Sequence, residues 1–138
     1  MNLIIILQQM ALLLLNMKYN RNYLESKAAL KKCNYSCVIC GWCVSDGQNN
    51  YIIEGAHLKS FEDDPSKDKR DNIIALCPNH HAMFDRFLFY IDSKTYTVFF
   101  KDVTNQYNNI CIKDKISYVK NEYLAFKQYQ YDEYWKRR

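Results

Sequence analysis

The stretch that decides the fold is Asp71-Asn72-Ile73-Ile74-Ala75-Leu76-Cys77-Pro78-Asn79-His80-His81-Ala82-Met83-Phe84-Asp85. Residues 73–76 form an apolar run of the length and composition typical of a short buried strand. Cys77 follows, and then Pro78, a residue favoured at the first position of a helix because it has no amide hydrogen to leave unpaired. The stretch therefore predicts a strand that passes into a helix, with one cysteine and two histidines at the junction.

Two pairs of metal-binding side chains have the same spacing. Two residues separate Cys37 from Cys40, and two separate Cys77 from His80; the pairs lie 77 − 40 = 37 positions apart. Such pairs can close a tetrahedral zinc site from two separate turns. Gly41 follows the second thiol, where the backbone turns sharply and its amides point at the sulfurs. We expect a structural Zn²⁺ that ties the loop around residue 40 to the start of the helix.

The other cysteines are expected to be free or partly buried thiols in a reducing cytoplasm: Cys33, Cys43 and Cys111. Four of the six cysteines crowd into residues 33–43, which suits metal binding better than a disulfide framework. Pairing Cys40 with Cys43 is the alternative zinc pair, although no glycine follows Cys43.

Further elements are predicted on both sides of this stretch. Residues 51–57 have the pattern of a strand, and residues 59–71 that of a charged loop. Residues 87–91 and 96–100 flank a four-residue connection and predict a β-hairpin. Residues 22–32 have a helical pattern, and a last helix is expected within residues 116–138. The order strand, loop, strand, helix predicts an α+β fold.

Four polar side chains have the chemistry that phosphodiester hydrolysis requires. Such a site needs a base that deprotonates water and a metal ion that neutralises the phosphate and the leaving oxygen. His57 ends the predicted strand, where a base can be presented, and Asn72 can hydrogen-bond across the loop to hold the backbone around it. His81 and Asp85 are four residues apart, on one helix face, and can point at a common ion. His80 points about a quarter turn away, toward the zinc.

The residues quoted above, with Trp42 and the run Glu54-Gly55-Ala56-His57-Leu58, closely resemble restriction-type HNH endonucleases over about residues 33–92. The resemblance implies a ββα-metal fold, His57 as the general base, Asn72 as a positioning residue and His81 as a ligand of a catalytic Mg²⁺ or Mn²⁺. It also implies DNA as the substrate, cut to leave a 5′-phosphate and a 3′-hydroxyl, in a restriction, defence or mobile-element setting. A noncatalytic, zinc-stabilised nucleic-acid-binding module is the alternative.

One position departs from the family pattern, because Ala56 stands where many HNH enzymes have an acidic metal ligand before the histidine. Asp85 is the first candidate for that second ligand by its helix register, and Glu54 is the second. Basic side chains in the loop between the strands are candidates for phosphate contacts: Lys59, Lys67, Lys69 and Arg70.

The whole chain has 138 residues and a formal charge of +4, which is compatible with a phosphate-bearing partner without requiring one. Residues 3–15 form an apolar run that is too short to cross a bilayer and lacks the basic start of a signal peptide. Three interpretations stay open: a packing or dimerising helix, an extension dispensable before Met17, or a membrane-associating segment. We expect a helical extension over residues 1–32 and an endonuclease domain over 33–138 with its core at 37–92. The protein is expected to be cytoplasmic and of bacterial or phage type. A homodimer or a targeting subunit is a possible partner besides DNA, and no stable membrane insertion is expected.

Overall fold

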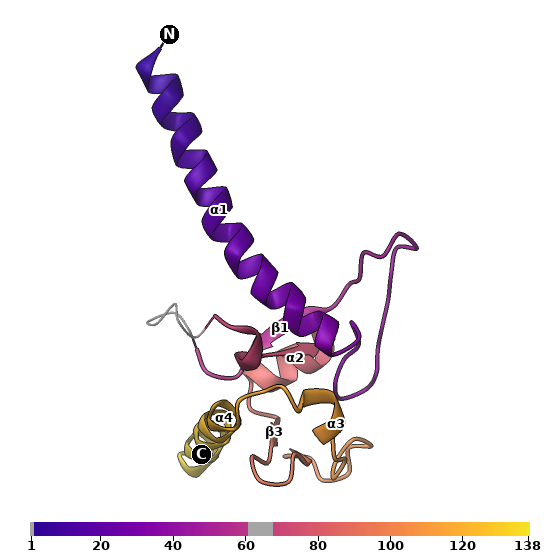
Figure 1. Cartoon of the computed structure of the whole chain (residues 1–138). Coiled ribbons are helices and arrows are strands. Elements are labelled where there is room, and N and C mark those ends of the chain that lie inside the picture. Colours follow the sequence, from indigo (N-terminus) through magenta and orange to yellow (C-terminus); the bar gives the residue numbers. More distant parts are fainter. Residues whose placement is uncertain (1, 61–67) are drawn as a thin grey trace.

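The computed structural model describes residues 2–60 and 68–138, and for residues 14–22 it describes the backbone alone (Figure 1). Helices and short strands alternate along the chain, with two two-stranded antiparallel sheets, β1–β2 and β3–β4. The predicted α+β class is thus confirmed. Of the predicted phosphate contacts, Lys67 lies outside the described residues.

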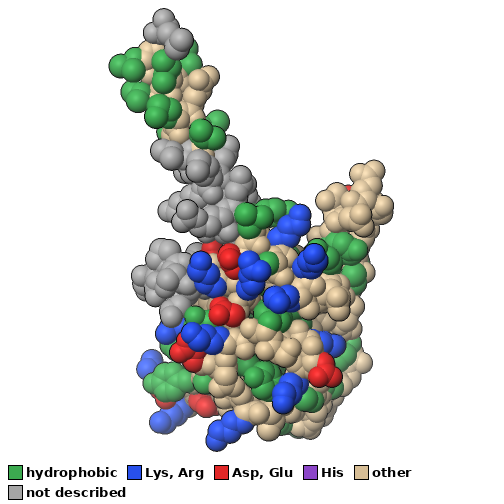
Figure 2. Space-filling view, in the orientation of Figure 1, with side chains coloured by type: hydrophobic (Ala, Val, Ile, Leu, Met, Phe, Trp, Pro, Cys, Tyr) green, Lys and Arg blue, Asp and Glu red, His purple; other side chains and the backbone are tan. Residues whose placement is uncertain are grey.

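Helix α1 (Leu3–Lys32) joins the two predicted helical stretches into one, because neither proline nor glycine interrupts them. Its first half projects away from the rest of the chain, and hydrophobic side chains cover more than one of its sides (Figures 1 and 2). Leu3, Leu7 and Leu13 are each more than half exposed. No helix in the described residues is long and apolar enough to cross a membrane. The last turns of α1 are different, since they pack on the sheet and Ala29 there is fully buried.

Strands β1 (Glu54–His57) and β2 (Ile73–Leu76) form the central hairpin, with Glu54 opposite Leu76 and His57 opposite Ile73. Every residue of β2 is buried, because α1 and α2 both contact it. The close approach of α1 to the hairpin depends on Gly55: a Cβ there would lie 2.8 Å from the Ser26 Oγ atom. The first strand is shorter than the predicted 51–57, and Tyr51 instead forms an isolated bridge with Ser45.

Helix α2 (Pro78–Asp85) begins directly after β2, as the sequence predicts. Cys77 is its N-cap residue and its sulfur accepts a hydrogen bond from the His80 amide at 3.4 Å. The loop before β2 ends in the 3₁₀ turn η2 (Arg70–Asn72), which packs on α1. There the Arg70 guanidinium and amide bind Glu25 and hold the pKa of that carboxyl below its usual value.

The predicted hairpin is present as β3 (Phe89–Ile91) paired with β4 (Val98–Phe100), and α4 packs on β3. The last helix expected within residues 116–138 is present as α4 (Asn121–Lys136), and a short helix that was not predicted, α3 (Lys113–Ile116), precedes it. The chain leaves the helical path between them because the Lys120 amide donates to the Asp71 carbonyl. This bond and the buried face of α4 fix α4 beside the central hairpin.

Candidate active site and metal cluster

Four side chains from two segments converge at the start of α2. The ligand atoms of Cys37, Cys40, Cys77 and His80 all lie within 4.8 Å of one another. The two cysteines of the first pair come from the turn after α1, where the Gly41 amide donates to the Cys37 carbonyl at 2.8 Å and Gly41 has a φ of +77°. That left-handed conformation favours glycine, so the turn depends on Gly41 as the sequence predicts.

The separations within this cluster fit a tetrahedral zinc ion. Zn–S bonds of about 2.3 Å and Zn–N bonds of about 2.0 Å place two sulfurs roughly 3.8 Å apart, and a sulfur and a nitrogen roughly 3.5 Å apart. The Cys40 and Cys77 sulfurs are 3.9 Å apart. The His80 Nδ1 atom is 3.7 Å from the Cys37 sulfur and 3.2 Å from that of Cys77. The donor set therefore fits a tetrahedral metal ion.

The surroundings of the cluster favour a bound cation. Burial, with the neighbouring thiols of Cys37 and Cys77, raises the pKa of Cys40 to about 11, while the Trp42 amide opposes the shift. Three thiolates at these distances repel one another unless a cation lies between them. Burial lowers the pKa of His80, which keeps its ring neutral, as a metal ligand must be.

The remaining cysteines lie apart from this cluster. Cys43 and Cys111 are exposed, and Cys33 is buried, with its sulfur 3.1 Å from the Tyr118 hydroxyl. The cluster uses Cys37 with Cys40, so the alternative pair Cys40–Cys43 has no counterpart in it.

A second group of polar side chains lines an open cavity of about 300 Å³ on the other side of α2 from His80. The cavity receives residues from three elements: His57 and Ser60 at the end of β1, His81 and Asp85 from α2, and Lys127 and Gln130 from α4. Three of the four predicted catalytic side chains thus meet in one cleft. The fourth, Asn72, is fully buried behind it.

Asn72 joins the entry of β2 to the segment that follows His57. Its Oδ1 accepts from the Lys59 amide at 2.9 Å, and its Nδ2 donates to the Lys59 carbonyl at 2.8 Å. The Leu58 amide also donates to the Asn72 carbonyl at 3.0 Å. These bonds fix the backbone on the C-terminal side of His57.

Each cleft histidine has a carboxylate on one ring nitrogen. The His57 Nε2 atom lies 2.9 Å from Asp68 Oδ1, and the His81 Nδ1 atom lies 2.7 Å from Glu54 Oε1. Asp68 is buried, and within the described residues its second oxygen has no hydrogen-bond partner. Sequence reasoning did not identify Asp68, since no local pattern distinguishes it from the other aspartates of the same charged loop.

Asp85 and Glu54 contact different nitrogens of His81. Asp85 Oδ2 is 3.7 Å from Nε2, whereas Glu54 holds Nδ1. Glu54 therefore orients the ring and leaves Nε2 on the side of Asp85. Ala56, at the position where an acidic ligand was expected, is buried and contributes no donor.

Comparison with known proteins supports the resemblance to HNH endonucleases over part of the chain. The family model described as HNH endonuclease matches residues 37–92, the segment that holds both the metal cluster and the cleft histidines. Over residues 37–92, the chain is similar to HNH endonucleases. The resemblance to HNH endonucleases inferred from the motifs is thereby confirmed for residues 37–92. No protein with a curated description matches the chain.

A similarity of fold extends beyond the matched segment. A solved structure titled "Modification dependent TagI restriction endonuclease" is similar to this chain with a TM-score of 0.61 at 19% sequence identity. The similarity covers 78% of this chain and 37% of that protein, so this chain spans little more than a third of its length. At such identity the likeness concerns the fold, which here includes elements on both sides of residues 37–92.

Proposed function

We propose that the chain is a metal-dependent DNA endonuclease in which His57 is the general base and His81 binds the catalytic divalent ion. The observation that carries the proposal is the convergence of His57 and His81 on one cleft, each with a carboxylate on one ring nitrogen. A purely structural pair of histidines would not need to face a solvent-accessible cavity together.

His57 acts on the proton of the attacking water. When its Nε2 hydrogen is donated to Asp68, the ring is held in one tautomer and Nδ1 is the basic nitrogen. The ring becomes an imidazolium as it takes the proton, and the buried Asp68 carboxylate stabilises that charge, in the way an aspartate supports a catalytic histidine in hydrolases. Asp68 is thus a positioning residue in the proposal.

His81 and Asp85 are the proposed ligands of the catalytic Mg²⁺ or Mn²⁺. Two ligands of one such ion, each about 2.1 Å from it, are roughly 3 to 4 Å apart, and the separation of 3.7 Å between His81 Nε2 and Asp85 Oδ2 lies in this range. A bound divalent ion would neutralise the phosphate and the leaving oxygen. Glu54 fixes the His81 ring through Nδ1, an arrangement that commonly orients metal-binding histidines.

In the proposed reaction the oxygen of water forms a bond to phosphorus while the bond from phosphorus to the 3′ oxygen breaks. The 3′ oxygen takes up a proton, so the products are a 5′-phosphate and a 3′-hydroxyl. Asn72 contributes by fixing the segment after His57, and Cys37, Cys40, Cys77 and His80 contribute by holding Zn²⁺ at the start of the helix that carries His81.

Phosphate contacts are proposed for Lys59, Lys67, Lys69 and Arg70. Lys59 has its ammonium 4.8 Å from the centre of the Phe126 ring, and Arg70 also holds Glu25, so loss of Arg70 would cost stability as well as binding. Phosphate contacts do not read bases, and we propose that a second copy of the chain or a targeting subunit contributes to the choice of site in a restriction, defence or mobile-element setting.

The second candidate function is a noncatalytic, zinc-stabilised nucleic-acid-binding module. Ala56 favours it, because that buried position offers no acidic ligand for an ion. Cleavage distinguishes the two functions directly.

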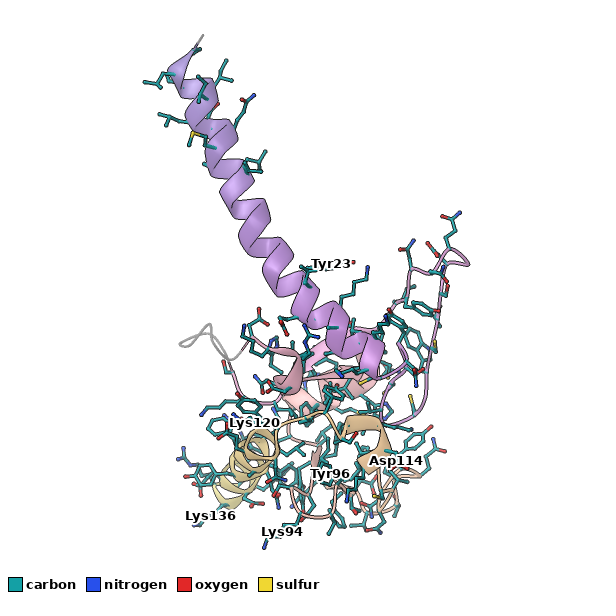
Figure 3. The ribbon with its side chains drawn as sticks, in the orientation of Figure 1. Tyr23, Lys94, Tyr96, Asp114, Lys120 and Lys136 are labelled. Atoms are coloured by element: carbon teal, nitrogen blue, oxygen red, sulfur yellow. The ribbon has the colours of Figure 1, made fainter. Side chains whose placement is uncertain are left out.

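The deciding experiment incubates supercoiled plasmid with the purified chain and Mg²⁺ or Mn²⁺. Wild type and Lys94→Ala, a control at the exposed outer end of the β3–β4 hairpin (Figure 3), are expected to nick or cut it. His57→Ala is expected to lose activity by a factor of at least about a hundred while keeping its fold. If all three proteins cut the plasmid at the same rate, His57 has no part in the mechanism. If none of them cuts it, the nucleic-acid-binding module is favoured.

A further inference from the structure

Lys127 belongs to α4, outside residues 37–92, yet it lines the same cavity as His57 and His81. Among the described residues that line the cleft, it is the one lysine, and no arginine is present. A cleft that receives a phosphodiester must neutralise the charge of the backbone on either side of the cut. The position of Lys127 therefore calls for an explanation beyond packing.

Two aromatic rings hold the side chain of Lys127 in place. Its ammonium nitrogen lies 4.5 Å from the centre of the Phe84 ring and 4.6 Å from that of Phe87. Cation–π contacts of this kind fix the direction of a lysine but accept none of its three N–H groups in a conventional hydrogen bond. The ammonium is thus positioned while its hydrogen-bonding capacity stays available.

No oxygen atom in the described residues accepts a hydrogen bond from Lys127, and Asp85 acts on it only through its charge. Lys127 is also partly buried, and this burial lowers the pKa of its ammonium. Two other lysines near this helix differ: Lys120 forms an ion pair with Glu122 at 3.1 Å, and Lys101 lies exposed over the Trp135 ring. A partly desolvated cation without an acceptor is costly unless something anionic approaches it.

We propose that Lys127 binds a phosphate oxygen of the DNA strand that occupies the cleft. The inference rests on the proposed function, because it assumes that this cleft receives DNA. An entering phosphate oxygen supplies the acceptor that Lys127 lacks and lies beside Asp85, where a catalytic ion would contact the same strand. α4 is then part of the substrate site and not only a cover for the β3–β4 hairpin.

The test measures DNA binding in a protein that cannot cut, so that it does not depend on catalysis. The full chain carrying His57→Ala is titrated with a DNA duplex over a range of salt concentrations, alone and with Lys127→Met or Lys101→Met. Methionine keeps the packing against the aromatic rings and removes the charge. Lys101→Met is the matched control, because it also removes an ammonium that lies over an aromatic ring, at 4.5 Å, outside the cleft.

Lys127→Met is expected to weaken binding about tenfold or more and to reduce the slope of log K against log salt by about one, the value for one lost phosphate contact. Its unfolding temperature should stay equal or rise, since a buried charge is removed, whereas a lysine with a structural role would lower it when lost. Lys101→Met should alter affinity less than twofold. An unchanged slope in Lys127→Met overturns the inference while leaving the proposed nuclease intact. Absence of any duplex binding by His57→Ala protein overturns both.

Discussion

Replacing Asn72 by alanine tests how the fold positions the cleft. The side chain is fully buried and makes two hydrogen bonds to the backbone of Lys59, two residues after His57. Alanine removes both bonds and leaves the Lys59 amide and carbonyl without these partners. We expect loss of stability and loss of cleavage together, although Asn72 does not line the cavity.

The expected loss of stability follows from the loss of these two hydrogen bonds. Each contributes about 1 kcal/mol, and each unsatisfied, partly buried backbone group adds about 1 kcal/mol to the loss, so the free energy of unfolding should fall by about 2 to 4 kcal/mol. For a domain of this length the unfolding temperature should drop by roughly 6 to 15 °C. A displacement of His57 by about 1 Å would slow cleavage roughly a hundredfold.

Asn108 provides a matched control, because it also bonds the backbone twice: its Oδ1 accepts from the Phe100 amide at 2.8 Å and its Nδ2 donates to the Val103 carbonyl at 3.2 Å. Thermal unfolding and single-turnover plasmid cleavage are measured for both alanine variants, with cleavage well below either unfolding temperature. Asn108→Ala should lose stability and cut at the wild-type rate. Wild-type cleavage by folded Asn72→Ala protein would refute the positioning role.

Three further outcomes are expected. Glu54→Ala should raise the Mn²⁺ concentration for half-maximal cleavage about 10- to 100-fold, because the His81 ring loses the partner of Nδ1; an unchanged requirement would contradict this. Gly55→Ala should destabilise the fold by about 1 to 3 kcal/mol, because the added Cβ clashes with the Ser26 Oγ. Ser26→Ala should restore part of that stability in the double variant, and equal unfolding temperatures of the single and double variants would disprove the contact. Removing residues 1–16 should leave unfolding temperature and cleavage unchanged, because the described side chains there are exposed or nearly so, and a loss of either would show that the segment packs.

The sequence predicts those parts of the fold that local patterns determine. Pro78 after Cys77 marks the start of α2, and the two-residue spacing within each ligand pair indicates the metal cluster. The sequence predicts both features because each signal depends on residues that are neighbours in the chain. The short helix α3 and the break between it and α4 were not predicted. The break depends on a bond from Lys120 to Asp71, 49 positions away in the chain.

The contacts of the cleft carboxylates could likewise not be predicted from local sequence patterns. Asp68 reaches His57 from 11 positions further along the chain, and nothing in its sequence neighbourhood indicates this contact. Helix register correctly places Asp85 near His81. The contact of Glu54 with the other ring nitrogen depends instead on how β1 lies beside α2, which local sequence does not indicate. Lys127 could not be associated with the cleft at all, because α4 docks there through tertiary packing.

The central claim is that the adjacent residues His80 and His81 serve two different metal sites, one structural and one catalytic. The most direct measurement compares zinc content, thermal unfolding and plasmid cleavage for His80→Ala and His81→Ala. His81→Ala should hold about one Zn²⁺ per chain, melt like the wild type and fail to cut, whereas His80→Ala should lose zinc and fold together. Retention of zinc and fold by His80→Ala, or wild-type cleavage by His81→Ala, would contradict the claim.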